Sequence, residues 1–153
     1  MSSIVHSLQV NPLGGVPKFQ VPSIEVHLEG VHGDKQKDTK HHGGLLKAVS
    51  LFSLEVIHVL QHEGHPIDCG TTGENITLAG LDWTTISEGV RLEIGQVMLE
   101  VTMFAQPCKT IRNSFSNGKF NRIAEKSNPG FSRVYAKVIQ EGTIHTGDIV
   151  TIR

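Results

Sequence analysis

The sequence is that of a small protein with almost balanced charge. Its 153 residues include 14 Lys and Arg against 15 Asp and Glu, and 38% of them are hydrophobic. This length allows one domain with a single core, which we expect to span residues 1–153. The charge balance argues against a nucleic-acid binder or a membrane-surface protein.

Cysteine usage and the N-terminal sequence indicate the compartment. Two cysteines, Cys69 and Cys108, do not make a disulfide framework. The sequence "MSSIVHSLQV" lacks the charged start and apolar block of a signal peptide, and no run of residues approaches the length of a membrane span. We therefore expect a cytoplasmic protein with reduced thiols.

Alternation of apolar and polar residues predicts several strands with one buried face. The first is "SIEVHLEG" (residues 23–30), and further strands are expected in 73–80, 133–142 and 142–153. The segment "VRLEIGQVMLEVTM" (90–103) has two alternating arms on either side of Gly95 and Gln96. That arrangement is typical of a hairpin with a two-residue turn.

One α-helix is predicted to begin near Ser53. This serine suits the N-cap, Glu55 suits the first turn, and Leu54, Ile57 and Leu60 recur at helical spacing.

Short helices are also expected in 109–115 and 119–126. Many short strands, glycine-rich turns and few helices together predict a mainly β fold, closed or nearly closed into a β-barrel.

Cys108 stands in the segment "FAQPCKTIRNSF" (104–115), where a strand-like run ends and basic residues follow. Between residues 101 and 124 there is no acid, but Lys109, Arg112, Lys119 and Arg122 are present. Cations beside a thiol favour the thiolate, which attacks electrophiles and binds metals. They also suit an anionic ligand. The alternative is a small buried hydrophobic residue beside a solvated basic face.

A second basic segment is "GDKQKDTKHHGG" (33–44), which Lys47 follows. Its glycines would let the backbone approach a ligand closely. His41 and His42 are adjacent, so in a strand only one of them would face a site. A polar surface loop is the alternative interpretation.

Two further groups of residues are candidate sites. Glu74 and Asn75 lie between a glycine and a predicted strand. Asn75 offers a hydrogen-bond donor and an acceptor to a heterocycle, and Glu74 could orient a lysine. An ordinary turn explains both residues as well. His58, His62 and His65 have partly zinc-like spacing, but solvation of the helix end explains them better.

Four of these segments, taken in order, resemble the MOSC family, named after the C-terminal domain of molybdenum cofactor sulfurases. They are "GDKQKDTKHHGG", "GENITLAGL", "LEVTMFAQPCKTI" and "AKVIQEGTIHTGDIV". The resemblance runs over nearly the whole chain and is to the small stand-alone bacterial members.

The resemblance implies a MOSC-type β-barrel that binds the molybdenum cofactor (molybdopterin). Cys108 would then be the catalytic residue and molybdenum ligand, as in reductases of N-hydroxylated compounds, or would carry a persulfide, as in sulfurase-type relatives. The remaining residues would bind the cofactor: His41, His42, Gly43, Glu74 and Asn75 in the pterin pocket, and Lys47, Lys109 and Arg112 near the phosphate.

The resemblance also bears on cofactors and partners. Because the chain ends at Arg153, directly after the last predicted strand, we expect no pyridoxal phosphate in this domain. An electron- or sulfur-donor protein, such as a reductase or a cysteine desulfurase, would supply the electrons or the sulfur. The reaction would act on a small-molecule substrate. We expect no nucleic-acid and no membrane partner.

Overall fold

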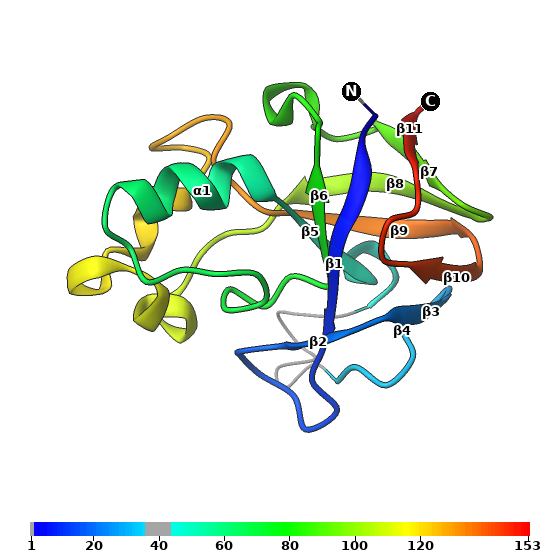
Figure 1. Ribbon diagram of the computed structural model, residues 1–153, viewed down its shortest axis with the longest axis horizontal. Helices are drawn as coiled ribbons and strands as arrows, with labels where there is room; N and C mark the ends of the chain where they lie inside the picture. Colours follow the sequence, from blue (N-terminus) through cyan, green and yellow to red (C-terminus); the bar gives the residue numbers. More distant parts are fainter. Residues whose placement is uncertain (1, 36–43) are drawn as a thin grey trace.

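A computed structural model describes residues 2–35 and 44–153 and shows a mainly β architecture with few helices (Figure 1). The strands are β1 (Ile4–Val10), β2 (Phe19–Val21), β3 (Ser23–His27), β4 (Gly30–Val31), β5 (Val49–Ser53), β6 (Ile76–Ala79), β7 (Arg91–Ile94), β8 (Val97–Phe104), β9 (Val134–Gln140), β10 (Gly142–His145) and β11 (Val150–Ile152). The helices are α1 (Leu54–His62) and the short 3₁₀ helices η1 (Leu45–Lys47), η2 (Trp83–Thr85), η3 (Lys109–Ser114), η4 (Ser116–Gly118) and η5 (Phe120–Ile123).

The described strands form two sheets. An eight-stranded sheet has the order β11-β7-β8-β9-β5-β6-β1-β2, and a three-stranded sheet has the order β10-β3-β4. Neighbouring strands are antiparallel except β5 and β6, which are parallel and are connected through α1. The crossover explains why the single α-helix of the described residues covers this part of the sheet.

Neither of these sheets closes on itself within the described residues, so the expected closed barrel is not confirmed. The two ends of the large sheet nevertheless approach each other. A bridge pairs Ile4 with Ile149, and the Val5 N–H donates to the Asp148 carbonyl at 2.9 Å. The coarser prediction of a mainly β fold is confirmed.

The hairpin and helix predictions are confirmed by the local structure. Ile94 pairs with Val97 around the two-residue turn. Ser53 is the N-cap of α1, and its Oγ accepts a hydrogen bond from the Val56 N–H at 3.2 Å. The short helices expected after Cys108 are present as η3 and η5.

Strands β1 and β5 were not predicted. In β5 all five residues are buried, because the strand pairs with β6 on one side and β9 on the other and is covered on both faces. Alternation is therefore missing from "VSLFS", and a strand signal based on period two does not detect it.

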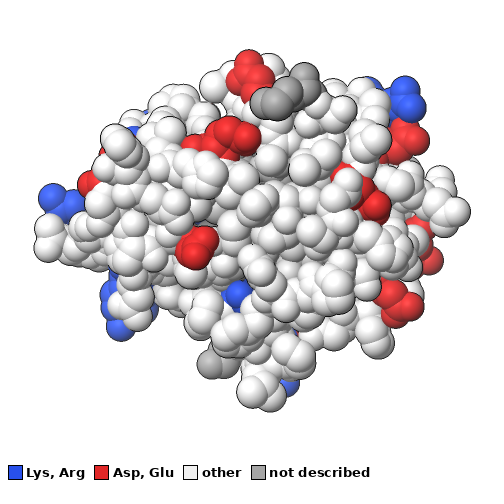
Figure 2. All heavy atoms as spheres, in the orientation of Figure 1, with Lys and Arg blue, Asp and Glu red and all other residues white. Residues whose placement is uncertain are grey.

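The core is built from aliphatic residues of both sheets and α1. The large side chains that are almost fully buried include Phe52, Leu51, Ile57, Leu60, Ile76, Leu92 and Leu99. Charged residues of both signs are spread over the outside, and Figure 2 shows Asp and Glu scattered across one face of the described molecule. No helix among the described residues is long and apolar enough to cross a bilayer.

Two loops that carry functional residues pack closely at Gly70. The Lys18 N–H donates to the Gly70 carbonyl at 2.9 Å. Gly70 has a φ of 83°, in the left-handed region, and a Cβ there would collide with the Lys18 carbonyl oxygen. Only glycine allows this approach at low cost.

We expect Gly70→Ala to lower the free energy of unfolding by about 2–4 kcal/mol, because it combines backbone strain with a steric clash. Gly89→Ala is the matched control: its φ is 90°, but nothing lies within 4 Å of the added Cβ. This control should cost only about 1–2 kcal/mol. Equal losses in urea unfolding of the two variants would show that the close packing at Gly70 contributes nothing.

Candidate functional site

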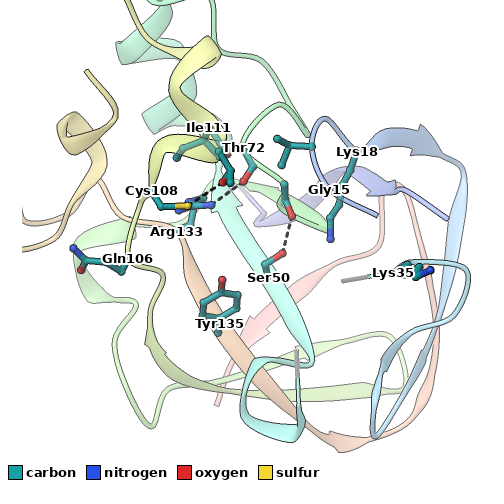
Figure 3. Close-up of a pocket in the computed structure, with 13 residues that line it drawn as sticks. Gly15, Lys18, Lys35, Ser50, Thr72, Gln106, Cys108, Ile111, Arg133 and Tyr135 are labelled. Atoms are coloured by element: carbon teal, nitrogen blue, oxygen red, sulfur yellow. Dashed lines mark hydrogen bonds between the residues drawn. The ribbon is translucent and has the colours of Figure 1, made fainter. Parts of the chain in front are cut away.

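A cavity of about 210 Å³ lies between the loops before β2, β6, η3 and β9. Its lining combines small, polar and cationic residues with a few apolar ones (Figure 3). The lining residues are Gly15, Val16, Lys18, Lys35, Ser50, Thr72, Gly73, Gln106, Cys108, Thr110, Ile111, Arg133 and Tyr135.

Cys108 enters the cavity at the point where β8 has ended and η3 begins. It is the N-cap residue of η3 in an extended conformation, and it is half-buried. Its Sγ lies 2.9 Å from Thr110 Oγ1. The strand, the proline at 107 and the helix start therefore place a free thiol at the cavity wall.

Arg133 is a buried cation at the cavity. Its Nη1 donates to the Thr72 carbonyl at 2.7 Å, whereas its Nε is buried and has no hydrogen-bond partner among the residues that the structure describes. Burial lowers the pKa of Arg133, and the nearby Tyr135 and Glu74 oppose this effect. A guanidinium keeps its charge in proteins, so Arg133 brings positive charge to the cavity wall.

Tyr135 follows Arg133 on the same face of the chain and also lines the cavity. Figure 3 shows its hydroxyl pointing towards Cys108 and Arg133. Burial raises the pKa of Tyr135, so the phenol keeps its proton through neutral pH. The ammonium of Lys47 lies 5.4 Å from the centre of the Tyr135 ring, which places another cation close to the cavity.

Lys18 and Lys35 lie on the other side of the cavity from Cys108 (Figure 3). Lys18 is buried, and its Nζ lies 2.5 Å from Asp34 Oδ2. The same carboxylate oxygen accepts a hydrogen bond from Asn75 Nδ2 at 2.8 Å. A buried network therefore joins a cavity lysine to the start of β6.

Asn75 is fully buried and does not line the cavity. Its Oδ1 accepts from the Ser50 N–H at 3.1 Å, and its Nδ2 donates to the Gln9 carbonyl at 3.2 Å as well as to Asp34. The side chain is used in joining loops and strands. A direct contact between Asn75 and a bound cofactor stays a prediction.

Glu74 is also fully buried and lies outside the lining. Its carboxylate accepts hydrogen bonds from the hydroxyls of Thr72 and Thr77, at 2.9 and 3.3 Å. Burial raises the pKa of Glu74, against the opposing effect of these hydrogen bonds and of the Arg133 charge. Glu74 therefore supports the wall of the cavity that Thr72 and Arg133 form, and a direct contact between Glu74 and a bound cofactor stays a prediction.

The other expected site residues are placed differently from Cys108. Lys109 and Arg112 are exposed on η3 and do not line the cavity; Arg112 Nη1 donates to the Lys109 carbonyl at 3.1 Å. His41, His42 and Gly43 lie outside the described residues. Their roles stay predictions.

Arg133 and Tyr135 were not identified from the sequence, although a signal was present. In "SRVYAKV" they alternate with Val134 and Ala136, so the pattern puts them on one face and the apolar residues on the other. One strand face thus carries a charged residue and the only tyrosine of the chain, directly opposite a cysteine-bearing loop. This combination would have supported a site prediction.

His58 and His62 of α1 and His65 beyond it do not come together as a group of possible metal ligands among the described residues. His58 and His62 are exposed, and His65 Nδ1 accepts a hydrogen bond from the Ser116 N–H at 3.1 Å. This agrees with the interpretation that these residues solvate the helix end and the adjacent loop.

Comparison with known proteins identifies a family model and several relatives. The model of the MOSC domain matches residues 38–151. The uncharacterised protein YflK of Bacillus subtilis is 26% identical over 126 residues, which is 82% of this chain and 56% of YflK. The chain thus spans little more than half the length of this curated relative.

Two solved structures share the fold. The YuaD protein of Bacillus subtilis superposes with a TM-score of 0.75 at 18% identity, covering 99% of this chain and 96% of YuaD. YiiM of Geobacillus stearothermophilus gives a TM-score of 0.73 at 22% identity, covering 99% of this chain and 75% of YiiM. At these identities the likeness concerns the fold alone.

The buried Glu74 carboxyl predicts a characteristic pH dependence of stability. Because its pKa is raised above the ordinary 4.5, the unfolded chain releases this proton first as the pH rises. The free energy of unfolding therefore falls with pH between 4.5 and the raised value. We expect Glu74→Gln to gain stability relative to the parent as the pH is raised from about 4 to 7.

Glu100→Gln is the control, for which we expect a pH dependence of stability of the opposite sign. A hydrogen bond from Arg91 lowers the pKa of Glu100, so the parent loses stability relative to this variant as the pH falls through 4.5. Urea unfolding at several pH values measures both differences. A Glu74→Gln difference that is constant or declines with rising pH would contradict the account.

Proposed function

Because the chain belongs to the MOSC domain family, which is associated with molybdenum cofactor binding, we propose that its cavity binds this cofactor and that Cys108 ligates the molybdenum. The observation that carries the proposal is the meeting of a free thiol with a buried guanidinium in one cavity. Cys108 and Arg133 both line it.

The chemistry of the lining suits the two ends of such a cofactor. A cysteine sulfur is a soft ligand and suits a thiophilic metal. Arg133 and the two lysines of the cavity, Lys18 and Lys35, suit an anionic group.

The volume of the cavity limits how much of a ligand it encloses. About 210 Å³ is below the range of roughly 300–1,000 Å³ that is common for small-molecule sites. A pterin cofactor would therefore lie only partly inside it. Lys47, which contacts the ring of Tyr135, would lie close to the enclosed part.

The proposed activity is the reduction of N-hydroxylated compounds. Such a reaction converts an N–OH group to N–H and water and consumes two electrons and two protons. The bound cofactor supplies the two-electron chemistry, and a donor protein supplies the electrons. The chain itself would bind and orient: Cys108 would hold the metal, Arg133 would hold an anionic group, and Tyr135 keeps a protonated hydroxyl in the cavity.

Sulfur transfer is the second candidate function, and the same pair of residues favours it. A persulfide on Cys108 would carry negative charge, which the adjacent Arg133 would stabilise. In that case a cysteine desulfurase would donate the sulfur. Cofactor content and persulfide content distinguish the two functions.

Removal of the Cys108 thiol should abolish metal retention. We expect the parent, purified from a host that makes the cofactor in excess, to contain molybdenum and pterin in nearly equal amounts. Cys108→Ser should reduce molybdenum to about a tenth or less, since even indirect support of a ligand is worth about 10–100-fold in affinity.

Cys69→Ser is the matched control. Burial raises the pKa of Cys69, which keeps this thiol protonated, and it does not line the cavity. Full molybdenum in Cys108→Ser would refute the ligand role. Absence of molybdenum from the parent, together with a persulfide on Cys108 detected by mass spectrometry, would favour the sulfur carrier.

The cation that holds the anionic part of the cofactor can also be tested. We expect Arg133→Gln to weaken pterin retention by about tenfold or more, because a hydrogen bond to a charged group contributes about 1.5–3 kcal/mol. Arg133→Lys keeps the charge and should retain an intermediate amount.

The double variant Lys109→Gln/Arg112→Gln is the control, since both residues are exposed outside the cavity. Pterin lost from this variant and kept in Arg133→Gln would assign the anionic group to η3 instead. Thermal unfolding of each variant would show whether the fold is retained.

A further inference from the structure

We propose that Glu25, His27 and His32 form a zinc-binding site on the three-stranded sheet. One ligand atom from each residue lies within 4.8 Å of the others, and all three side chains are exposed. None of them lines the cavity, so the site is separate from the one described above.

The strand geometry brings the three side chains together. Glu25 and His27 are two residues apart on β3, so they share one face of the sheet. Ile24, which precedes them, and Val26, which lies between them, are buried. β4 pairs with β3 and ends at Val31, so His32 is the residue directly after this neighbouring strand.

Backbone hydrogen bonds hold the ligands' main chains in place. The His32 N–H donates to the Glu25 carbonyl at 2.9 Å. On the other side of β3, Thr143 of β10 pairs with Glu25. Figure 1 shows β3, β4 and β10 together, away from α1. Two of the three ligands therefore lie on a paired strand, and the third is in the turn that directly follows β4.

The two imidazoles already lie next to each other. The ring centres of His27 and His32 are 6.0 Å apart, and the rings are nearly perpendicular, at 75°. Donor atoms at zinc-bond length around a tetrahedral ion lie about 3.4 Å from one another. Exposed side chains on a fixed backbone can close from the observed separation by rotation about their χ angles.

A second carboxylate increases the negative charge at the site. Glu141 Oε2 lies 3.7 Å from His27 Nδ1 and accepts a hydrogen bond from the Leu28 N–H at 2.7 Å. Two imidazoles with two carboxylates attract a cation more strongly than an isolated histidine pair would.

The donor set identifies the class of metal. Imidazole nitrogens favour zinc and its late first-row neighbours, whereas magnesium and calcium require oxygen ligands. Two histidines and one glutamate are an established zinc ligand set, in which a fourth position is left for water. We therefore assign the site to zinc with three protein ligands.

Calorimetric titration of the full chain with zinc chloride tests this assignment. Every protein in the series also carries Cys108→Ser and Cys69→Ser, so that no thiolate competes for the metal. We expect one zinc ion per chain. His27→Ala and His32→Ala should each weaken binding by at least about tenfold, and Glu25→Gln should weaken it in the same direction.

His58→Ala/His62→Ala is the matched control, because it removes two exposed histidines from α1. This variant should bind zinc as the parent does. The assignment is overturned if the parent binds no zinc, if binding survives unchanged in His27→Ala and His32→Ala, or if it is lost in the α1 control. Circular dichroism melting confirms that each variant is folded.

Discussion

The side-chain amide of Asn75 is the contact on which the rest of the site depends. It is fully buried at the start of β6 and bonds to Ser50 of β5, to the Gln9 carbonyl of β1 and to the carboxylate of Asp34. Asp34 in turn pairs with Lys18 at the cavity. A buried polar group left without its partner costs about 1–3 kcal/mol. One amide thus fixes two central strands and two loops relative to each other.

This network explains how a small β protein can keep a buried cation available. The wall formed by Thr72, next to Glu74, accepts one hydrogen bond from Arg133 and holds its guanidinium at the cavity. Cys108 reaches the same space from the start of η3. The buried carboxyl of Glu74 helps to offset the charge of the guanidinium from behind. The cavity therefore combines a free thiol, which is a soft donor, with buried positive charge.

Sequence patterns predicted those elements that depend on neighbouring residues. The hairpin around Gly95 and the N-cap at Ser53 were found because a turn and a cap are encoded within a few residues. Cys108 was found through its local setting and a family resemblance. The role of Asn75 was missed because its hydrogen-bond partners are distant in the sequence, and an isolated "GEN" looks like an exposed turn. Arg133 was missed because a charged residue at a strand start does not reveal its burial.

X-ray absorption at the molybdenum edge tests the central claim most directly. The protein would be loaded in a host that makes the cofactor in excess. The number of sulfur ligands of molybdenum would then be compared between the parent and the Cys108→Ser variant, using whatever cofactor this variant retains. The account predicts one sulfur ligand more in the parent, contributed by the cysteine beside Arg133. Molybdenum bound with the same sulfur coordination in both proteins, or no molybdenum in the parent, would contradict it.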